Sequence, residues 1–225
     1  MKKIMFAVQN LGSMKKSATQ VTPALRKYVE EQIIPMYDTF DRAHRREHVQ
    51  YVIDEALRLA EHYPVKEDVV YTAAAYHDTG LGTGRKTHHL ASGAIIRGDR
   101  NLLQWLTPEE IELAAQAAED HRASSDHEPR SIYGKLIAEA DRQIDPMTVI
   151  RRTIQYGLKN YPELNREGHW SRMMEHLRHK YGENGYLKLW IPESDNAARL
   201  QKLRTLIQDE SGMRAVFNDI FDSEE

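Results

Sequence analysis

The chain of 225 residues is long enough for one sizeable hydrophobic core, and no Pro-, Gly- or Ser-rich linker marks a point of division. Its 31 lysine and arginine residues against 34 aspartate and glutamate residues give a formal net charge of -3, so no global positive field would attract nucleic acid or an anionic membrane. The absence of cysteine excludes disulfides and thiolate metal sites, which leaves histidine and carboxylate side chains as the protein ligands for any metal.

The N-terminal segment, residues 1–20, is predicted to be weakly structured, and Met14 is an alternative to Met1 as the natural start. Its apolar run is too short for a signal peptide, and no later segment of the sequence approaches the length of a membrane span. Together with the lack of cysteine, these features lead us to expect a cytoplasmic protein.

Amphipathic helices are predicted along the rest of the chain, because apolar side chains recur there at three- and four-residue steps. The first helices are expected at 23–37, 41–62, 67–78, 88–97, from Thr107 onward, and 131–145. Further helices are expected near 146–158, 168–180, 195–208 and 210–222. The C-terminal helices over 151–225 are expected to pack on the same domain. No segment shows convincing period-two alternation, so the predicted fold class is all-α.

The helix expected over 67–78 is apolar almost all round and runs directly into His77 and Asp78. An ionised carboxylate is costly to bury without a partner, so a cation or a hydrogen-bond network is expected beside Asp78. The loop that follows, 80–86, is rich in glycine and ends in two basic residues. As a nucleotide-binding fingerprint this loop is weak, because no strand precedes it and the glycine spacing is wrong.

Three more ligand-type side chains lie on apolar helix faces. His48 continues an apolar stripe by four-residue steps, His121 extends the stripe of the helix that starts near residue 107, and Asp141 lies within a stripe of its own. Any one of them alone is more typical of a hydrogen-bonded core histidine or a capping aspartate than of a metal ligand. Five such residues would each need a buried partner, whereas one or two cations satisfy them together.

The order and spacing of these residues resemble the H…HD…D signature of the HD-domain superfamily of metal-dependent phosphohydrolases. The segment 73–80 is similar to that family's hydrophobic-HD-x-G segment, 41–49 to the entry helix of bacterial members, and 135–141 to their final Asp helix. The resemblance covers about residues 38–150 and implies an HD-domain-like helical bundle over 21–150. It is specific for the fold and much less so for the substrate.

The resemblance also implies a set of metal ligands. The residues that correspond to the family's single-metal ligands are His48, His77, Asp78 and Asp141. Members with two ions add two histidines, and Asp78 would then bridge the ions; the candidates here are His89 and His121. His89 is favoured over His88 because His89 and Gly93 resemble the family's H-x3-G-A helix, but His88 stays open as a ligand. The donor set suits one or two divalent ions of Fe, Mn, Mg or Zn.

The chain departs from the family pattern at Leu81, where many members carry a lysine near the phosphate. The candidates for phosphate contact in its place are Arg85, Lys86, Arg122 and Arg142. Guanidinium groups bind phosphate oxygens in a bidentate way, and a surface ion pair is the alternative interpretation for each of these arginines.

The remaining histidines have simpler interpretations. His44 either orients a ligand or belongs to an ordinary polar helix face. His169, His176 and His179 lie in a charged segment without apolar enclosure, so we expect them on the solvated surface.

The predicted function is hydrolysis of a nucleotide or another small phosphate ester, with Asp78 or Asp141 as acceptor for the proton of the attacking water. A di-iron oxygenase is the first alternative, because in the HD-domain superfamily the same six ligands would serve it. The second alternative is a non-catalytic ligand-binding or regulatory module whose metal is structural. The expected partner is the small phosphorylated substrate, not nucleic acid or a membrane, and the chain is expected to be a monomer or a homodimer.

Overall fold

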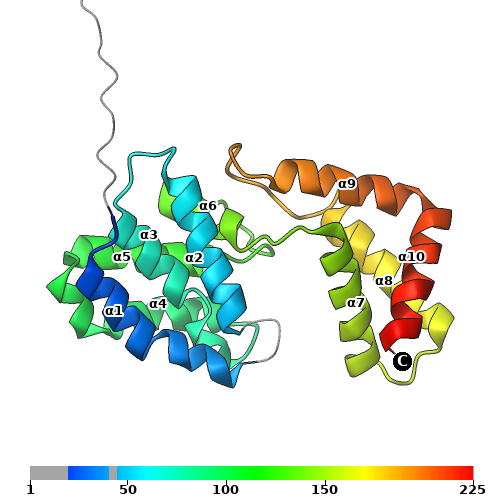
Figure 1. The fold of residues 1–225 in the computed structure, drawn as a ribbon, viewed down its shortest axis with the longest axis horizontal. Helices are drawn as coiled ribbons and strands as arrows, with labels where there is room; N and C mark the ends of the chain where they lie inside the picture. Colours follow the sequence, from blue (N-terminus) through cyan, green and yellow to red (C-terminus); the bar gives the residue numbers. More distant parts are fainter. Residues whose placement is uncertain (1–19, 41–44, 225) are drawn as a thin grey trace, which may run out of the picture.

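Over residues 20–40 and 45–224, which the computed structural model describes, the chain forms ten α-helices and no β-strand (Figure 1). The predicted weak structure of the N-terminal segment falls outside these residues apart from Gln20, and so do residues 41–44 with the interpretation of His44. Among the residues described, no helix combines the length and the apolar character that a bilayer span requires. The all-α prediction is confirmed.

The first group of helices follows the predicted segments closely. Its members are α1 (Pro23–Gln32), α2 (Arg46–Ala60), α3 (Glu67–Tyr76), α4 (His88–Gly98), α5 (Pro108–Glu119) and α6 (Ile132–Ala140), with the short 3-10 helices η1 (Ile34–Thr39), η3 (Thr79–Thr83) and η4 (Arg100–Gln104). The helix expected over 23–37 is split because Pro35 lacks the amide hydrogen that an uninterrupted helix needs, and η1 takes over. The helices expected to reach residues 78 and 145 end earlier, at Tyr76 and Ala140.

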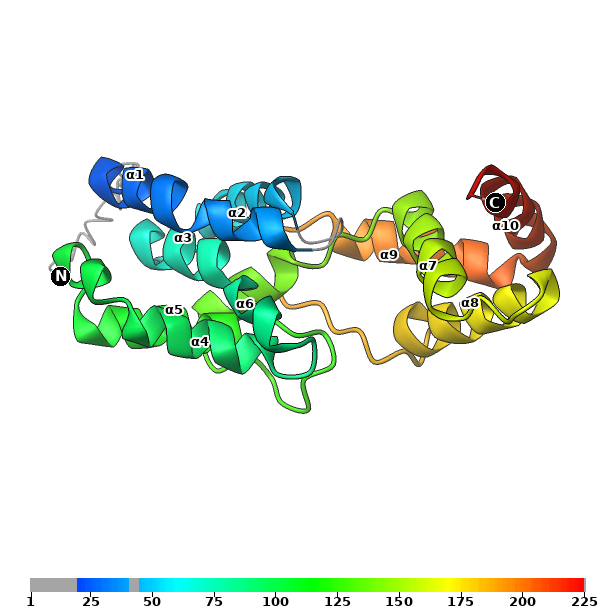
Figure 2. The same cartoon turned by 90° about the horizontal axis from the view of Figure 1, so that it is seen from below.

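A second group of helices, which we call the C-terminal unit, consists of α7 (Pro146–Asn160), α8 (Arg166–Tyr181), α9 (Asn196–Gln208) and α10 (Glu210–Glu224). Figures 1 and 2 show this unit beside α1–α6. The segment 141–145 links α6 to α7, and the segment between α8 and α9 runs back to α6. The apolar residues of 144–221 form their own buried cluster, and those of 21–140 form another, which Ile191 joins. The C-terminal helices were expected to pack on the first core; instead, α7 turns its apolar face to α8, α9 and α10.

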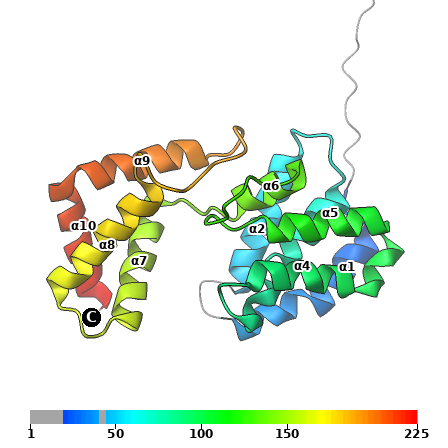
Figure 3. The ribbon, with the colours of Figure 1, turned by 180° about the vertical axis from the view of Figure 1, so that it is seen from behind.

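The most enclosed element is α3, which packs against α1, α2, α4, α5 and α6. Every residue from Asp68 to Tyr76 is buried, because small alanines allow the neighbouring helices to approach from all sides. Figure 3 shows α4 and α5 side by side, in agreement with their extensive contact. Since α3 ends inside the first group of helices, the residues that follow it are delivered to the interior.

Candidate metal centre

The end of α3 places His77 and Asp78 in the interior. His77 is the C-cap of α3 and is 0% exposed, while Asp78 precedes η3 and is 3% exposed. The chain then passes under α4 at Gly80, whose amide donates a hydrogen bond of 2.9 Å to Ser92 Oγ. A Cβ at Gly80 would lie 2.2 Å from the carbonyl oxygen of His88, so only glycine lets the start of α4 approach this closely.

One group of ligand atoms gathers around Oδ2 of Asp78. Nε2 of His48, from α2, lies 3.7 Å from Oδ2, and Nε2 of His77 lies 3.3 Å from it. Asp141, the C-cap of α6, brings its Oδ1 to 3.2 Å from Nε2 of His48 and 3.8 Å from Nε2 of His77. The structure therefore brings together the four residues that the H…HD…D spacing pointed to.

A second group gathers around the other oxygen of the same carboxylate. Oδ1 of Asp78 lies 3.2 Å from Nε2 of His88, at the start of α4, and 3.5 Å from Nε2 of His121, just after α5. The two Nε2 atoms of His88 and His121 are only 3.1 Å apart. Asp78, His88 and His121 satisfy the spacing of a metal-binding trio, as do His48, His77 and Asp78.

Backbone carbonyls fix the tautomer of three of these histidines. Nδ1 of His77 lies 2.7 Å from Ala74 O, Nδ1 of His88 lies 2.8 Å from Arg85 O, and Nδ1 of His121 lies 2.6 Å from Ala118 O. A carbonyl oxygen only accepts, so each Nδ1 carries the hydrogen, and each ring in its neutral form turns an Nε2 lone pair to the centre.

Two bare lone pairs at 3.1 Å, as on His88 and His121, repel each other unless a proton or a cation lies between them. Fixed Nδ1 donors of this kind are what orient metal-binding imidazoles in proteins. The donor set, imidazole nitrogen and carboxylate oxygen without sulfur, suits Fe, Mn or Zn. The residues present therefore fit one or two divalent cations.

The charges at the centre follow from this crowding. Burial alone would lower the pKa of His77, but the carboxylates of Asp78 and Asp141 outweigh it and raise that pKa to about 9. Burial would raise the pKa of Asp78, yet the charge of His77 and the hydrogen bonds from His121, His77 and His88 hold it well below its usual range. Burial would likewise raise the pKa of Asp141, but the hydrogen bond and the charge of His48 lower it. Both carboxylates are thus ionised at neutral pH.

The position of His89 differs from the expectation. The structure brings His88, not His89, to the cluster: the His89 ring lies 5.7 Å from that of His88, and its buried Nδ1 has no hydrogen-bond partner. Burial, with the positive charge of Arg122 nearby, lowers the pKa of His89 to about 4. The signal that selects His88 is its four-residue step to Ser92, which is fully buried in α4.

The four basic candidates for phosphate contact lie in different environments. Arg85 and Lys86 are exposed on the loop between η3 and α4, and half-buried Arg122 donates a hydrogen bond of 2.8 Å to Lys86 O. Arg142 is only 6% exposed and donates to the carbonyl oxygen of Ala138, and burial lowers its pKa. Arg142 is therefore neither a surface ion pair nor an open clamp.

Of the three histidines expected on the surface, His169 is buried instead. It is 4% exposed and its ring lies 5.6 Å from that of Phe221 in the core of the C-terminal unit. It occupies the same face of α8 as Met173 and Leu177, at helical steps that the charged neighbours concealed. His176 and His179 are exposed as expected.

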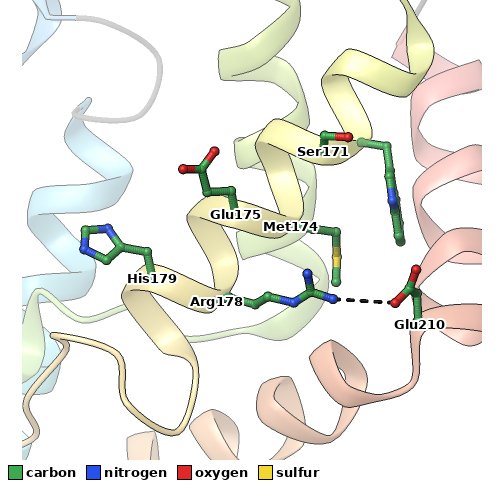
Figure 4. Close-up of a pocket in the computed structure, with 7 residues that line it drawn as sticks. Ser171, Met174, Glu175, Arg178, His179 and Glu210 are labelled. Carbon is green, nitrogen blue, oxygen red and sulfur yellow. Dashed lines mark ion pairs between the residues drawn. The ribbon is translucent and has the colours of Figure 1, made fainter.

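His179 lines an open pocket on the C-terminal unit, which has no residue in common with the cluster (Figure 4). The pocket lies between α8 and the start of α10, where Arg178 and Glu210 form an ion pair of 3.6 Å. Its lining residues are Trp170, Ser171, Met174, Glu175, Arg178, His179 and Glu210.

Tyr37, in η1, supports the centre without belonging to the predicted set. Its buried hydroxyl donates a hydrogen bond of 2.9 Å to Ala75 O and accepts one of 3.3 Å from the amide of Asp78. Burial and the charges of Asp78 and Asp141 raise the pKa of Tyr37 well above its usual value, so it stays a hydroxyl. Its four-residue step from Ile33 was the available signal in the sequence.

With this geometry in place, the comparison with known families is specific. Residues 45–143 match the family model of the HD domain, and this range contains every residue of the cluster, from His48 to Asp141. This segment of the chain belongs to the HD-domain family, as its motif predicted. HD domains belong to a superfamily of metal-dependent hydrolases and bind divalent metals. Comparisons with curated proteins and with solved structures found no match.

Proposed function

We propose that this protein is a metal-dependent phosphohydrolase that acts on a nucleotide or another small phosphate ester. The observation that carries the proposal is the division of the Asp78 carboxylate, whose Oδ2 faces His48 and His77 while its Oδ1 faces His88 and His121. A carboxylate shared in this way is suited to bridge two cations, and paired cations are typical of enzymes that hydrolyse phosphate esters.

In this proposal His48, His77, Asp78 and Asp141 would hold one ion, and Asp78, His88 and His121 would hold the other. Bound dications would lower the pKa of a coordinated water towards neutrality and neutralise charge on the phosphoryl oxygens. In His77, His88 and His121 the Nδ1–H already donates a hydrogen bond to a backbone carbonyl. Binding of a metal at Nε2 therefore requires no change of tautomer.

Asp141 is the better candidate for the proton acceptor. Its side chain is 27% exposed, whereas that of Asp78 is 5% exposed and surrounded by four imidazoles. Solvent can therefore reach Asp141, and its lowered pKa keeps it ionised and able to orient a water molecule. Arg85 and Lys86 supply exposed positive charge beside α4 for the phosphate of the substrate.

The test is a metal analysis of the purified protein followed by anaerobic phosphate release from a panel of nucleotides and small phosphate esters. We expect one or two equivalents of Mn, Fe or Zn, and phosphate release that His77→Ala and Asp78→Ala both abolish. Iron accompanied by oxygen consumption and no anaerobic phosphate release would instead establish the oxygenase. Bound metal without turnover in either assay would establish the non-catalytic module.

A further inference from the structure

Glu139, in α6, is a fully buried carboxylate that the proposed reaction does not use. It is 0% exposed, and within the part of the chain that the structure describes the hydrogen bonds to its side chain come from one segment, residues 190–196, which enters α9. Oε2 accepts from the amides of Trp190 at 2.7 Å and Ile191 at 3.4 Å. Neutral donors thus surround a group that, as a carboxylate, only accepts.

The other carboxylate oxygen is held as firmly. Oε1 of Glu139 accepts from Ser194 Oγ at 2.5 Å and from Asn196 Nδ2 at 2.9 Å. The same amide nitrogen of Asn196 lies 3.0 Å from the main-chain oxygen of Glu139, so it donates to the backbone of α6 as well. Ser194 and Asn196 are themselves buried, which removes water as a substitute for these donors.

The segment 190–196 belongs to the link between α8 and α9 of the C-terminal unit, and it runs back to contact α6 of the first group (Figure 2). Ile191 is 3% exposed in the first core, whereas the buried apolar residues of α9 belong to the second. The covalent link between the two groups, 141–145, leaves directly from the end of α6. This link and the contact made by 190–196 therefore meet at the last turn of the same helix.

That turn also supplies Asp141. The amide of Asp141 bonds to Ile137 O at 3.0 Å and its side chain reaches His48, while Glu139, two residues earlier, is bound to 190–196. Resting on the metal centre proposed above, we infer that Glu139 is a positioning residue. It clamps the last turn of α6 to 190–196 and so holds Asp141 at the distance that the first metal position requires. The hydrogen bonds between Glu139 and 190–196 thereby set the metal affinity of the centre.

Another hydrogen bond between the first group of helices and 190–196 supplies a control. Tyr63 donates to Oε2 of Glu193 at 2.6 Å, from the loop after α2, and Glu193 is exposed. This bond involves the same segment, 190–196, but not α6. Its loss should loosen the contact between the units without moving Asp141.

The experiment compares the full chain with Glu139→Gln, Asn196→Ala and the control Glu193→Gln. Each metal-stripped protein is titrated calorimetrically with Mn²⁺, its melting temperature is measured, and amide hydrogen exchange is followed over 137–141. We expect Glu139→Gln, which turns an amide NH2 towards existing donors, to weaken Mn²⁺ binding about 10- to 100-fold and to speed exchange in 137–141. Asn196→Ala should act in the same direction. Glu193→Gln should leave the Mn²⁺ affinity and the exchange over 137–141 at the parent values.

A lower melting temperature with parental Mn²⁺ affinity in Glu139→Gln would make Glu139 a merely structural residue and overturn the inference. If Glu139→Gln does not fold, Asn196→Ala decides, and parental affinity in that variant also overturns it. A parent chain that binds no Mn²⁺, Fe²⁺ or Zn²⁺ would instead remove the metal centre itself, and this inference with it. The two failures are distinguishable because only the latter is seen in the unsubstituted protein.

Discussion

Oδ1 of Asp78 lies 3.2 Å from Nε2 of His88, the first residue of α4, while Oδ2 of the same carboxylate faces His48 at the start of α2 and His77 at the end of α3. One side chain thus joins two groups of histidines that come from different helices. Because the two oxygens cannot move independently, any displacement of Asp78 changes both groups at once.

The choice between the adjacent histidines gives the first prediction. His88→Ala should reduce the bound metal by about one equivalent and lower kcat/KM at least about 100-fold, because it removes a ligand atom from the second group. His89→Ala is the matched control, since its ring lies outside the cluster, and it should keep the parental metal content and activity. Metal analysis and steady-state kinetics measure both. Loss of metal in His89→Ala with retention in His88→Ala would reverse the assignment.

The close approach of α4 to Gly80 gives the second prediction. A Cβ at Gly80 would lie 2.2 Å from His88 O and 2.7 Å from Ala91 Cβ, so Gly80→Ala must push α4 outward. We expect a loss of about 1–3 kcal/mol in the free energy of unfolding, as for other overpacked positions, together with weaker binding of the ion at His88 and His121. Chemical denaturation and metal titration are the measurements.

Gly82 supplies the control for this change, because nothing lies within 4 Å of a Cβ built there and its backbone has no positive φ. Gly82→Ala should therefore unfold and bind metal as the parent does. Equal effects at both glycines would show that flexibility of the loop, rather than contact with α4, is what matters.

The hydroxyl of Tyr37 gives the third prediction. Tyr37→Phe leaves the buried amide of Asp78 and the carbonyl of Ala75 without their partner, which should cost about 1–3 kcal/mol of unfolding free energy. Metal binding should weaken as well, because the amide that fixes Asp78 is released. Tyr156→Phe, at a side chain that is 48% exposed, is the control and should change neither denaturation midpoint nor metal affinity.

Local periodicity predicted α2, α3, α5 and α6 well, because each carries a continuous apolar stripe that must be buried. It also placed His48 and Asp141 on inward faces, which the structure brings within 3.2 Å of each other. The match of 45–143 to the HD domain confirms the family on which the ligand order depended.

What the sequence left undetermined depends on contacts between distant segments. Neighbouring positions such as His88 and His89 differ by about 100° around a helix, and the approach of α4 to Gly80 decides which one faces His121. The separate core of the C-terminal unit and the burial of Glu139 have the same origin. Both follow from the route of 190–196, which carries little periodic signal of its own.

The protonation of the metal-free centre gives the last prediction. The pKa of His77 is raised to about 9 in the folded chain, against about 6.5 for an unperturbed imidazole, because Asp78 and Asp141 stabilise its charged form. A raised folded-state pKa contributes stability that is complete below the unfolded value and is lost as the pH rises through the folded value. The metal-free protein should therefore become less stable between about pH 6.5 and 9, by up to about 3 kcal/mol.

Metal should reverse this trend, because a cation binds the neutral ring and replaces the proton as the positive charge beside both carboxylates. With saturating Mn²⁺, stability should hold or rise between pH 6.5 and 9, and the apparent Mn²⁺ affinity should increase over the same interval. Urea denaturation of the stripped and loaded protein at several pH values measures the difference. His77→Gln, which has no proton to lose in this range, should show a flatter profile when stripped. A stripped parent whose stability is independent of pH from 6.5 to 9 would contradict the charged state of His77 in the metal-free centre.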